Sequence, residues 1–255
     1  MLNFFFKRNE DFDYKKINDL LKIQNNDKEK IVLLTTGSFN PIHRMHLEIF
    51  NIAYKRLMSL NDYNVICSLI SPSADCYVKH KTSLLIPFKK RCEMISKAIE
   101  EYQKQTNLQI FLHKWEGNQS KFIDFPEVIS EIQKQLNKKC DKNIKLVYVC
   151  GMDHFIKCRN AFEENVIAID RKPFINHKYK DIPNKLIYLV KDENYEKSKI
   201  YSSSEIRDIY INDKIDDEQK LNMIKEITFD SVAKIVLDFY KKNYINVKKI
   251  NQYII

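Results

Sequence analysis

The stretch "KIVLLTTGSFNPIHRMHLEIF", residues 30–50, decides the fold. An apolar, β-branched run ends at Gly37, and from about residue 42 the apolar positions recur with helical period, which predicts a strand that turns into a helix. Gly37 lets the backbone approach a ligand closely, and Pro41 suits the first turn of a helix because its missing N–H is no loss there. Since helix N-termini carry unpaired N–H groups and partial positive charge, this turn predicts a phosphate site.

The same stretch contains two histidines, His43 and His46. Their spacing of three residues places both side chains on one face of the first turns of the predicted helix. Taken alone, the segment also fits a strand–turn–helix with two incidental surface histidines. Whether the pair belongs to a binding site is therefore inferred from the motifs in the rest of the chain.

Further strand-like runs follow at 64–71, 108–113, 144–150, 165–170 and 185–190. Helical patterns lie between most of them, at about 42–60, 87–105, 125–138 and 153–163. This alternation predicts an α/β fold, a doubly wound parallel sheet with helices on both faces. After about residue 200 the strands stop, and helical patterns at about 203–212, 217–226 and 230–243 predict a helical C-terminal part.

The 255 residues, 44% of them apolar, are enough for one large domain with a real core. Residues 1–29 are mostly polar and charged, and we interpret them as an N-terminal extension. Nothing resembling a linker separates the later helices from the strands. Residues 30–255 are therefore expected to form a single domain.

The net charge and the cysteines indicate which partners and which cellular compartment to expect. The net charge of +9 favours anionic partners, although a general abundance of lysine and asparagine explains it equally well. The six cysteines contain no CxxC pair, which favours reduced thiols over a disulfide framework or a zinc site. No apolar run approaches a membrane span of roughly 20 residues. We expect a soluble intracellular protein of the cytoplasm, with the nucleus left open.

In an open α/β sheet, ligands bind beyond the carboxyl ends of the strands. Functional residues are therefore expected just after the strands. In "ISPSADCYVKHK" (70–81), Lys79 and Lys81 can reach a phosphate or simply be solvated. In "HKWEGNQS" (113–120), Trp115 can stack on a flat heterocycle or pack in the core.

The stretch "YSSSEIRDIY" (201–210) opens a helical pattern. Ser202 and Glu205 fit a capping box, which needs no ligand. Three hydroxyls at a helix start with Arg207 one turn later also make an anion cradle. The two interpretations compete for the same backbone N–H groups.

Together these stretches resemble the HxGH-type nucleotidyltransferase superfamily, and within it the eukaryotic nicotinamide/nicotinate mononucleotide adenylyltransferases. The similar segments are "GSFNPIHRMHLEIF", "ISPSADCYVKH", "HKWEG", "LVYVCGMDHF", "YSSSEIR" and "ITFDSVAKIVLDFYKKNYI". They run in family order from about residue 31 to 245. The resemblance implies a Rossmann-like fold and adenylyl transfer from ATP to the mononucleotide, giving NAD or its deamido form plus pyrophosphate. Because the attacking phosphate is already anionic, positioning and charge neutralisation should dominate the catalysis.

The resemblance also implies roles for individual residues. His46 would stabilise charge at the α-phosphate of ATP, with His43 assisting. Other ATP contacts would come from backbone groups and side chains at Gly37, Ser38, Phe39, Gly151, Asp153, Ser203, Ser204 and Arg207. Lys79 would reach the phosphate of the mononucleotide, and Trp115 would stack on its pyridine ring. Magnesium (Mg2+) would arrive with ATP rather than in a dedicated protein site.

The chain departs from the family in two places. His43 stands where eukaryotic members usually have threonine. The segment after Asp153 is shorter than in animal enzymes and lacks their second tryptophan, for which Phe155, Phe162 or His154 would have to substitute. The preference between nicotinamide and nicotinate mononucleotide is therefore open.

Two alternatives remain beside this interpretation. One is another superfamily member, a cytidylyltransferase or a phosphopantetheine adenylyltransferase, although "KIYSSSEIR" lacks the arginine and glycine of the cytidylyltransferase motif. The other is a non-catalytic nucleic-acid-binding protein, whose binding should weaken steeply with salt. The main expectation has ATP and a mononucleotide as partners and neither nucleic acid nor a membrane. Whether the chain forms a homo-oligomer stays open.

Overall fold

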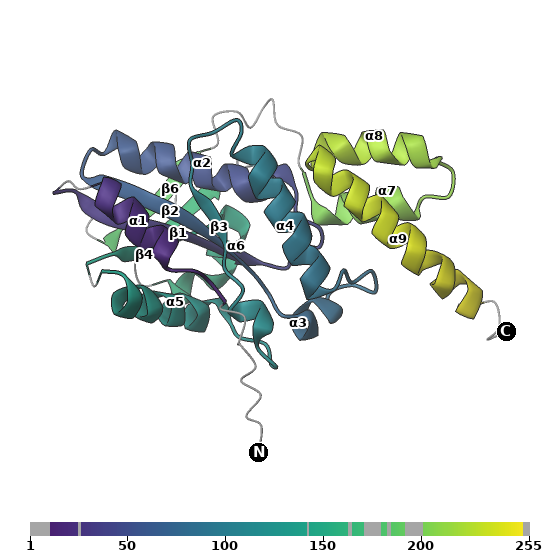
Figure 1. The fold of residues 1–255 in the computed structure, drawn as a ribbon, viewed down its shortest axis with the longest axis horizontal. Helices are drawn as coiled ribbons and strands as arrows, with labels where there is room; N and C mark the ends of the chain where they lie inside the picture. Colours follow the sequence, from purple (N-terminus) through teal and green to yellow (C-terminus); the bar gives the residue numbers. More distant parts are fainter. Residues whose placement is uncertain are drawn as a thin grey trace, which may run out of the picture.

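The computed structural model describes residues 11–24, 27–141, 143–162, 165–170, 180–182, 185–191 and 201–251. Its centre is a six-stranded parallel sheet in the order β3-β2-β1-β4-β5-β6 (Figure 1). The strands are β1 (Glu29–Gly37), β2 (Tyr63–Pro72), β3 (Ile110–Leu112), β4 (Lys145–Gly151), β5 (Val166–Asp170) and β6 (Ile187–Lys191). The strand order reverses between β1 and β4, which is where open α/β sheets bind ligands.

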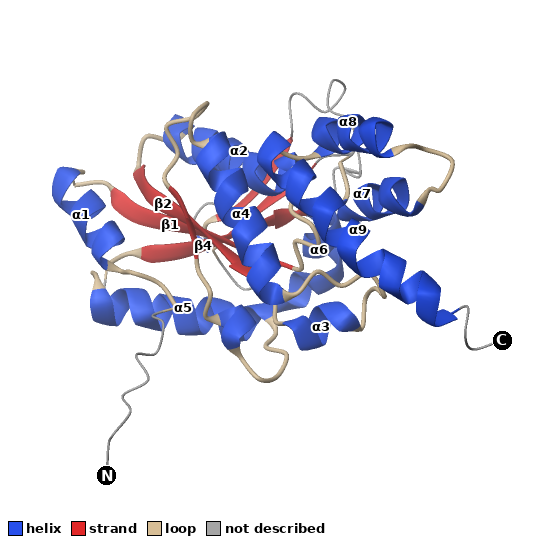
Figure 2. Cartoon of the chain, turned by 45° about the vertical axis from the view of Figure 1, so that its right-hand side comes forward, coloured by secondary structure: helices blue, strands red, loops and turns tan. Residues whose placement is uncertain are grey.

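The two faces of the sheet are covered by different helices. Side chains alternate across a strand, so Ile31 and Leu33 of β1 face one core while Val32 and Leu34 face the other. The first core holds α2 (Arg44–Ser59) and α4 (Phe88–Tyr102), and the second holds α1 (Lys15–Ile23), α5 (Phe125–Lys139) and α6 (Met152–Cys158). Figure 2 shows α2 and α4 on the opposite side of the strands from α5.

The predicted doubly wound parallel sheet is confirmed, with strand bounds within about two residues. The helix expected from about residue 42 begins at Arg44, with His43 as its N-cap residue. Pro41 therefore lies in the turn before the helix, outside the first helical turn. The helix expected over 153–163 ends at Cys158 and continues as a 3-10 turn, Arg159–Ala161.

The helical C-terminal part consists of α7 (Ser203–Ile211), α8 (Asp217–Ile227) and α9 (Asp230–Asn251). It packs on the first core, with α9 lying along α4 (Figure 1). Glu101 of α4 accepts hydrogen bonds from the backbone N–H groups of Asp230 and Ser231, 3.2 and 3.1 Å long. Thr228 donates to the carbonyl of Ile42, 2.7 Å away. These contacts hold the start of α9 against α4 and the α8–α9 junction against the turn that follows β1.

Part of the segment before β1 packs against the second core, although the sequence predicted an N-terminal extension there. Phe12, Tyr14 and Ile17 are buried in the second core, and the Tyr14 hydroxyl donates to Oε1 of Gln135 over 2.6 Å. Helix α1 packs beside β2. Residues 11–24 thus belong to the packed domain, whereas residues 1–10 of the expected extension lie outside the described residues.

Replacing Ile17 with alanine should lower the free energy of unfolding by about 2–4 kcal/mol, because the side chain is fully buried and a cavity would remain. Urea titration followed by circular dichroism measures the change. Ile23→Ala on the same helix is the matched control, since Ile23 is 80% exposed and its loss should cost little. Equal effects of the two substitutions would show that α1 does not dock on the sheet.

Candidate functional site

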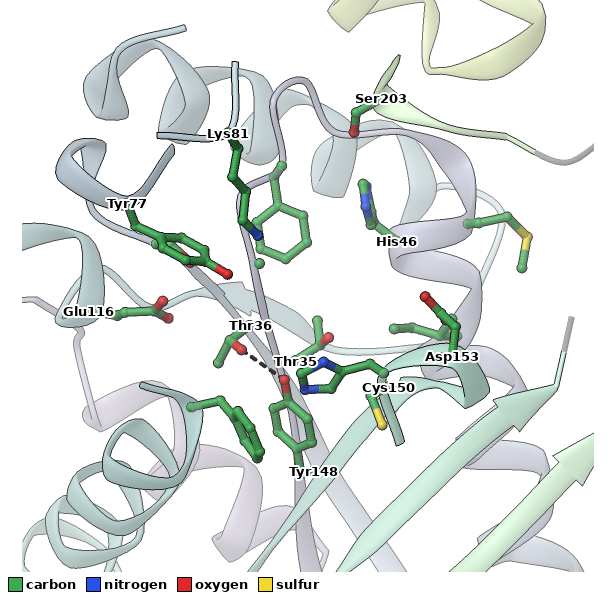
Figure 3. A pocket seen from close by; sticks show the side chains of 18 of the residues that line it. Thr35, Thr36, His46, Tyr77, Lys81, Glu116, Tyr148, Cys150, Asp153 and Ser203 are labelled. Carbon is green, nitrogen blue, oxygen red and sulfur yellow. Dashed lines mark hydrogen bonds between the residues drawn. The ribbon is translucent and has the colours of Figure 1, made fainter. Parts of the chain in front are cut away.

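A cavity of about 380 Å³ opens at the carboxyl ends of β1 and β4. The turn after β1, the start of α2, the loop after β2, the segment before α5, the start of α6 and the start of α7 all contribute to its walls. The cavity therefore sits at the point where the strand order reverses. Figure 3 shows His46, Asp153 and Ser203 on one side of it and Tyr77, Lys81 and Glu116 on the other.

The two histidines of the opening stretch form one unit in the cavity wall. Their rings stack with centroids 3.5 Å apart and planes 27° apart. The backbone N–H of His43 donates to Nδ1 of His46 over 3.1 Å, and Phe39 packs edge-on against the His46 ring. Because Nδ1 accepts this bond, the proton of a neutral His46 resides on Nε2. His46 is thus oriented as a hydrogen-bond donor, with the buried His43 behind it.

The turn after β1 is tied to the start of α7. Ser203 Oγ donates to the carbonyl of Pro41 over 2.7 Å, and Arg207 donates to the carbonyl of Asn40 over 2.6 Å and to Ser204 Oγ over 2.9 Å. Ser202 caps the helix by accepting from the N–H of Glu205 over 3.0 Å. The serine half of the capping box expected from the sequence is therefore formed.

The residues implied for ATP divide into those that line the cavity and those that support it. Its lining includes Gly37, Phe39, Gly151, Asp153 and Ser203. Ser204 and Arg207 lie outside the lining; Arg207 bonds the turn after β1 at the carbonyl of Asn40, and Ser204 accepts a hydrogen bond from Arg207. Ser38 also lies outside it, with its carbonyl accepting from Arg91 over 2.7 Å.

On the opposite wall, two implied residues lie outside the cavity lining, and a near neighbour of each lies within it. Lys79 is exposed at the end of α3 (Asp75–Lys79) and lies outside the cavity lining, whereas Lys81 is part of it. Trp115 is half-buried against the second core, and Glu116 beside it lines the cavity. The structure therefore does not bring Lys79 and Trp115 together with the histidines.

Of the three side chains considered for the second stacking position, His154 alone lines the cavity. Phe155 and Phe162 are buried in the second core and stack on each other with centroids 5.6 Å apart. The His154 ring packs edge-on against Phe125. Burial lowers the pKa of His154, so its neutral form is favoured.

Arg91 organises the loops around the cavity and was not anticipated from the sequence. Its guanidinium is fully buried and donates to the carbonyls of Ser38, Ser73 and Ile86 over 2.7, 2.6 and 3.0 Å. It also bonds Asp75 over 2.8 Å. One side chain of α4 thus links the turn after β1 to the loop after β2.

Glu116 is a buried carboxyl in the cavity wall, 3% exposed, and accepts a hydrogen bond from Ser71 over 2.8 Å. Burial raises its pKa to about 7, against the lowering effect of hydrogen bonds from Ser73 and Ser71 and of the Arg91 charge. At neutral pH the group is therefore divided between its charged and neutral forms.

This shift predicts a pH-dependent stability. Between its ordinary pKa of 4.5 and about 7, the folded state keeps a proton on Glu116 that the unfolded chain has released, so the free energy of unfolding falls as pH rises through this window. Glu116→Gln should remove up to about 3 kcal/mol of that fall. Urea titrations of both proteins at about pH 5 and about pH 8 measure it. The exposed Glu127→Gln serves as control, and a wild-type-like pH dependence in Glu116→Gln would contradict the assignment.

Within the described part of the chain, no group of three or more histidine, cysteine, aspartate or glutamate side chains is placed to hold a metal ion. All six cysteines are free thiols. No helix among the described residues is both long and apolar enough to cross a membrane.

Comparisons with known proteins agree with this geometry. The bovine (Bos taurus) nicotinamide/nicotinic acid mononucleotide adenylyltransferase 1 is 32% identical over 120 residues, covering 47% of this chain and 40% of the relative. The Arabidopsis thaliana nicotinamide/nicotinic acid mononucleotide adenylyltransferase is 30% identical over 130 residues, covering 50% and 51%. The match thus spans about half or less of the length of these curated relatives.

Among solved structures, the Plasmodium falciparum nicotinic acid mononucleotide adenylyltransferase complexed with APC superposes with a TM-score of 0.58 at 19% identity. The superposition covers 82% of this chain and 96% of that one, and it shows a shared fold. A family model described as Cytidylyltransferase-like matches residues 34–209, well over half of the chain, and includes both histidines and the start of α7. By this match and by its fold, the chain belongs to the cytidylyltransferase-like family.

Proposed function

We propose that this chain transfers the adenylyl group of ATP to nicotinamide or nicotinate mononucleotide and releases pyrophosphate. The observation that carries the proposal is the stacked histidine pair, which faces Lys81 and Glu116 across one cavity at the strand-order reversal. The relatives matched by sequence are named as adenylyltransferases of both mononucleotides. One solved structure with the shared fold is described as a complex with NaAD.

The proposed reaction needs little covalent chemistry from the protein. The phosphate of the mononucleotide attacks the α-phosphorus of ATP, and the bond to the departing pyrophosphate breaks. His46, held by the His43 backbone with its proton on Nε2, donates to an oxygen of the α-phosphate as negative charge builds there. Stacked against it, His43 keeps that ring from turning.

The ATP half of the cavity is assigned to the side that holds His46, Asp153 and Ser203. Backbone groups from Gly37 to Phe39 and the N-terminus of α7 supply N–H donors for phosphate oxygens. Arg207 holds these donors in place because it bonds the carbonyl of Asn40 in the turn after β1 and also bonds Ser204 at the start of α7. Gly151 ends β4 and Asp153 lies just after it, and both are assigned to contacts with the nucleotide.

The mononucleotide half is assigned to the opposite side. Lys81 lines the cavity there, and we give it the phosphate contact that the family resemblance implied for Lys79. A lysine acts here as a compact charge that neutralises the attacking phosphate while bringing it close to ATP.

Magnesium is proposed to enter with ATP. Asp153 lines the cavity, and its carboxylate would be the protein group that holds the ion, which dehydrates reluctantly and would keep much of its water. The ion would supply positive charge that offsets the charge of the phosphates.

The setting is proposed to be intracellular, because the six cysteines are free thiols and a reducing compartment keeps them so. ATP and the mononucleotide are the proposed partners, and nucleic acid is not among them.

The experiment that tests the proposal measures pyrophosphate release by the purified chain with magnesium. ATP and CTP are each paired with nicotinamide mononucleotide, nicotinate mononucleotide, phosphopantetheine and a phosphocholine-type acceptor. The proposal predicts release with ATP and at least one pyridine mononucleotide. Release only with CTP, or only with phosphopantetheine, would replace it by another nucleotidyltransferase activity.

A further inference from the structure

The short segment before α1, residues 11–14, is bonded to the loop that follows β3, residues 113–118. The backbone N–H of Lys114 donates to the carbonyl of Asp11 over 3.0 Å. The side-chain amide of Asn118 donates to the carboxylate of Asp11 over 2.6 Å. We call residues 11–14 the N-terminal strap, because they hold this loop near its start and at its end.

Tyr14, at the end of the strap, joins the loop to α5 through a buried chain of hydrogen bonds. Its hydroxyl donates to Oε1 of Gln135 over 2.6 Å, so it accepts from Nε2 of His113, 3.0 Å away. Burial lowers the pKa of His113 to about 4, so at neutral pH the ring is uncharged with its proton on Nε2. Gln135 donates in turn to Glu131 over 2.8 Å. Each donor in the chain thus has an acceptor, and Phe12 packs on the His113 ring with centroids 5.3 Å apart.

The loop held by the strap carries Glu116 into the wall of the cavity. Its second half is the 3-10 turn Glu116–Asn118, whose last residue is the one that bonds Asp11. The loop also packs against α4, because a side chain at Gly117 would collide with the ring of Phe88. The strap and α4 together therefore limit how far the cavity wall can move.

We infer that Asp11 and Tyr14 are positioning residues, which hold the loop 113–118 so that Glu116 keeps its place in the cavity wall. Both lie outside the cavity lining, so they act through the loop and not on a ligand. The inference rests on the proposed function for its effect on binding, since Glu116 lies on the side assigned to the mononucleotide (Figure 3). Loss of the strap contacts should weaken binding of the mononucleotide and leave binding of ATP unchanged.

The carboxyl group of Glu116 reports on the position of the loop. Burial is the main cause of its raised pKa; hydrogen bonds from two serines and the charge of Arg91 lower it, and Asp124 raises it. Lys81 and Tyr148 line the same cavity. If the loop moves and water reaches the carboxyl, the pKa should fall from about 7 toward its ordinary value of 4.5. A general loss of stability leaves this value unchanged as long as the protein is folded.

The first measurement is the pKa of Glu116 in the full chain without substrates, followed by the carbon-13 shift of its carboxyl group. Tyr14→Phe removes the hydroxyl from the buried chain, and Asp11→Ala removes the side-chain acceptor of Asn118. Each substitution should lower the pKa of Glu116 from about 7 to about 6 or below. Asp11→Asn keeps an oxygen that can accept from Asn118 and should restore the wild-type value.

The second measurement is calorimetric binding of nicotinamide mononucleotide and, separately, of ATP with magnesium. Tyr14→Phe and Asp11→Ala should each raise the Kd of the mononucleotide about three- to tenfold and leave the Kd of ATP unchanged. Asp13→Ala, at an exposed position of the strap, is the matched control and should keep both constants. Ile17→Ala lowers stability from within the second core but keeps the strap contacts, so it should also keep both constants and the pKa of Glu116.

The outcomes separate the strap from the proposed reaction. A wild-type pKa of Glu116 in folded Tyr14→Phe and in Asp11→Ala would overturn the inference, and so would an equal shift in Ile17→Ala. A lowered pKa with unchanged mononucleotide affinity would keep the positioning role and contradict the assignment of this wall to the mononucleotide. If the wild type bound no mononucleotide, the proposed function would fail, and the pKa of Glu116 would still decide whether the strap positions the loop.

Discussion

Replacing His46 with alanine is expected to lower kcat by two to three orders of magnitude, the usual effect of removing an oriented donor to a developing negative charge. The imidazole is placed for this role by the His43 N–H bond to Nδ1, which leaves Nε2 to donate into the cavity. Pyrophosphate release with saturating ATP and mononucleotide measures kcat, and calorimetric ATP binding measures the ground-state contact separately.

The fold should survive His46→Ala, because the ring is only partly buried at the cavity surface. Circular dichroism and urea titration check this point. His80→Ala, which removes an exposed histidine at the end of α3, is the matched control and should leave kcat unchanged. If His46→Ala kept near-normal turnover, the histidine pair would be a structural feature of the strand–turn–helix and no more.

Replacing Arg91 with methionine is expected to lower the free energy of unfolding by about 3–5 kcal/mol. The guanidinium is fully buried, and its removal leaves the carbonyls of Ser38, Ser73 and Ile86 without their donor. Its partner Asp75 is 42% exposed and can return to water, so most of the loss comes from the stranded carbonyls. Urea titration of both proteins measures the difference.

Arg91→Lys should recover only a small part of that stability, because one ammonium group cannot replace the fork that spans three carbonyls and a carboxylate. Lys89→Met, on the exposed side of the same helix, should cost less than about 0.5 kcal/mol. A loss in Arg91→Met as small as in this control would show that the guanidinium does not hold the two loops together.

The sheet and most helices were predictable because each signal is local. The β-branched runs of β1, β2 and β4 carry no helical period, and α2, α4 and α5 repeat apolar residues at helical spacing. The packing of α1 was not predictable in this way. Only Ile17 of that helix is fully buried, and the charged residues around it resemble an unattached segment.

The histidine pair was predictable because His43 is the N-cap residue and His46 the third residue of one helix, whose start the sequence marks. Lys79 and Lys81 show the limit of that reasoning. Lys79 is the last residue of α3, whereas Lys81 lies in the segment that follows the helix, so helical spacing does not fix the relative directions of the two side chains. Which of the two faces the cavity depends on how α3 docks, and that is set by tertiary contacts such as the burial of Val78.

Arg91 and Glu116 escaped prediction for the same reason. Arg91 sits in an ordinary amphipathic helix, and its partners lie 53 residues away at Ser38 and 18 away at Ser73. Glu116 comes directly after Trp115 in the chain, and its burial results from the path of the chain beside β2. Neither residue has a local pattern that separates it from a surface charge.

The most direct test of the central claim is product formation. Purified chain incubated with ATP, magnesium and either nicotinamide or nicotinate mononucleotide should yield the corresponding dinucleotide, identified by mass spectrometry, with one pyrophosphate released for each dinucleotide formed. His46→Ala should suppress both products together. Absence of dinucleotide with both mononucleotides, from a protein that is folded and binds ATP, would contradict the account.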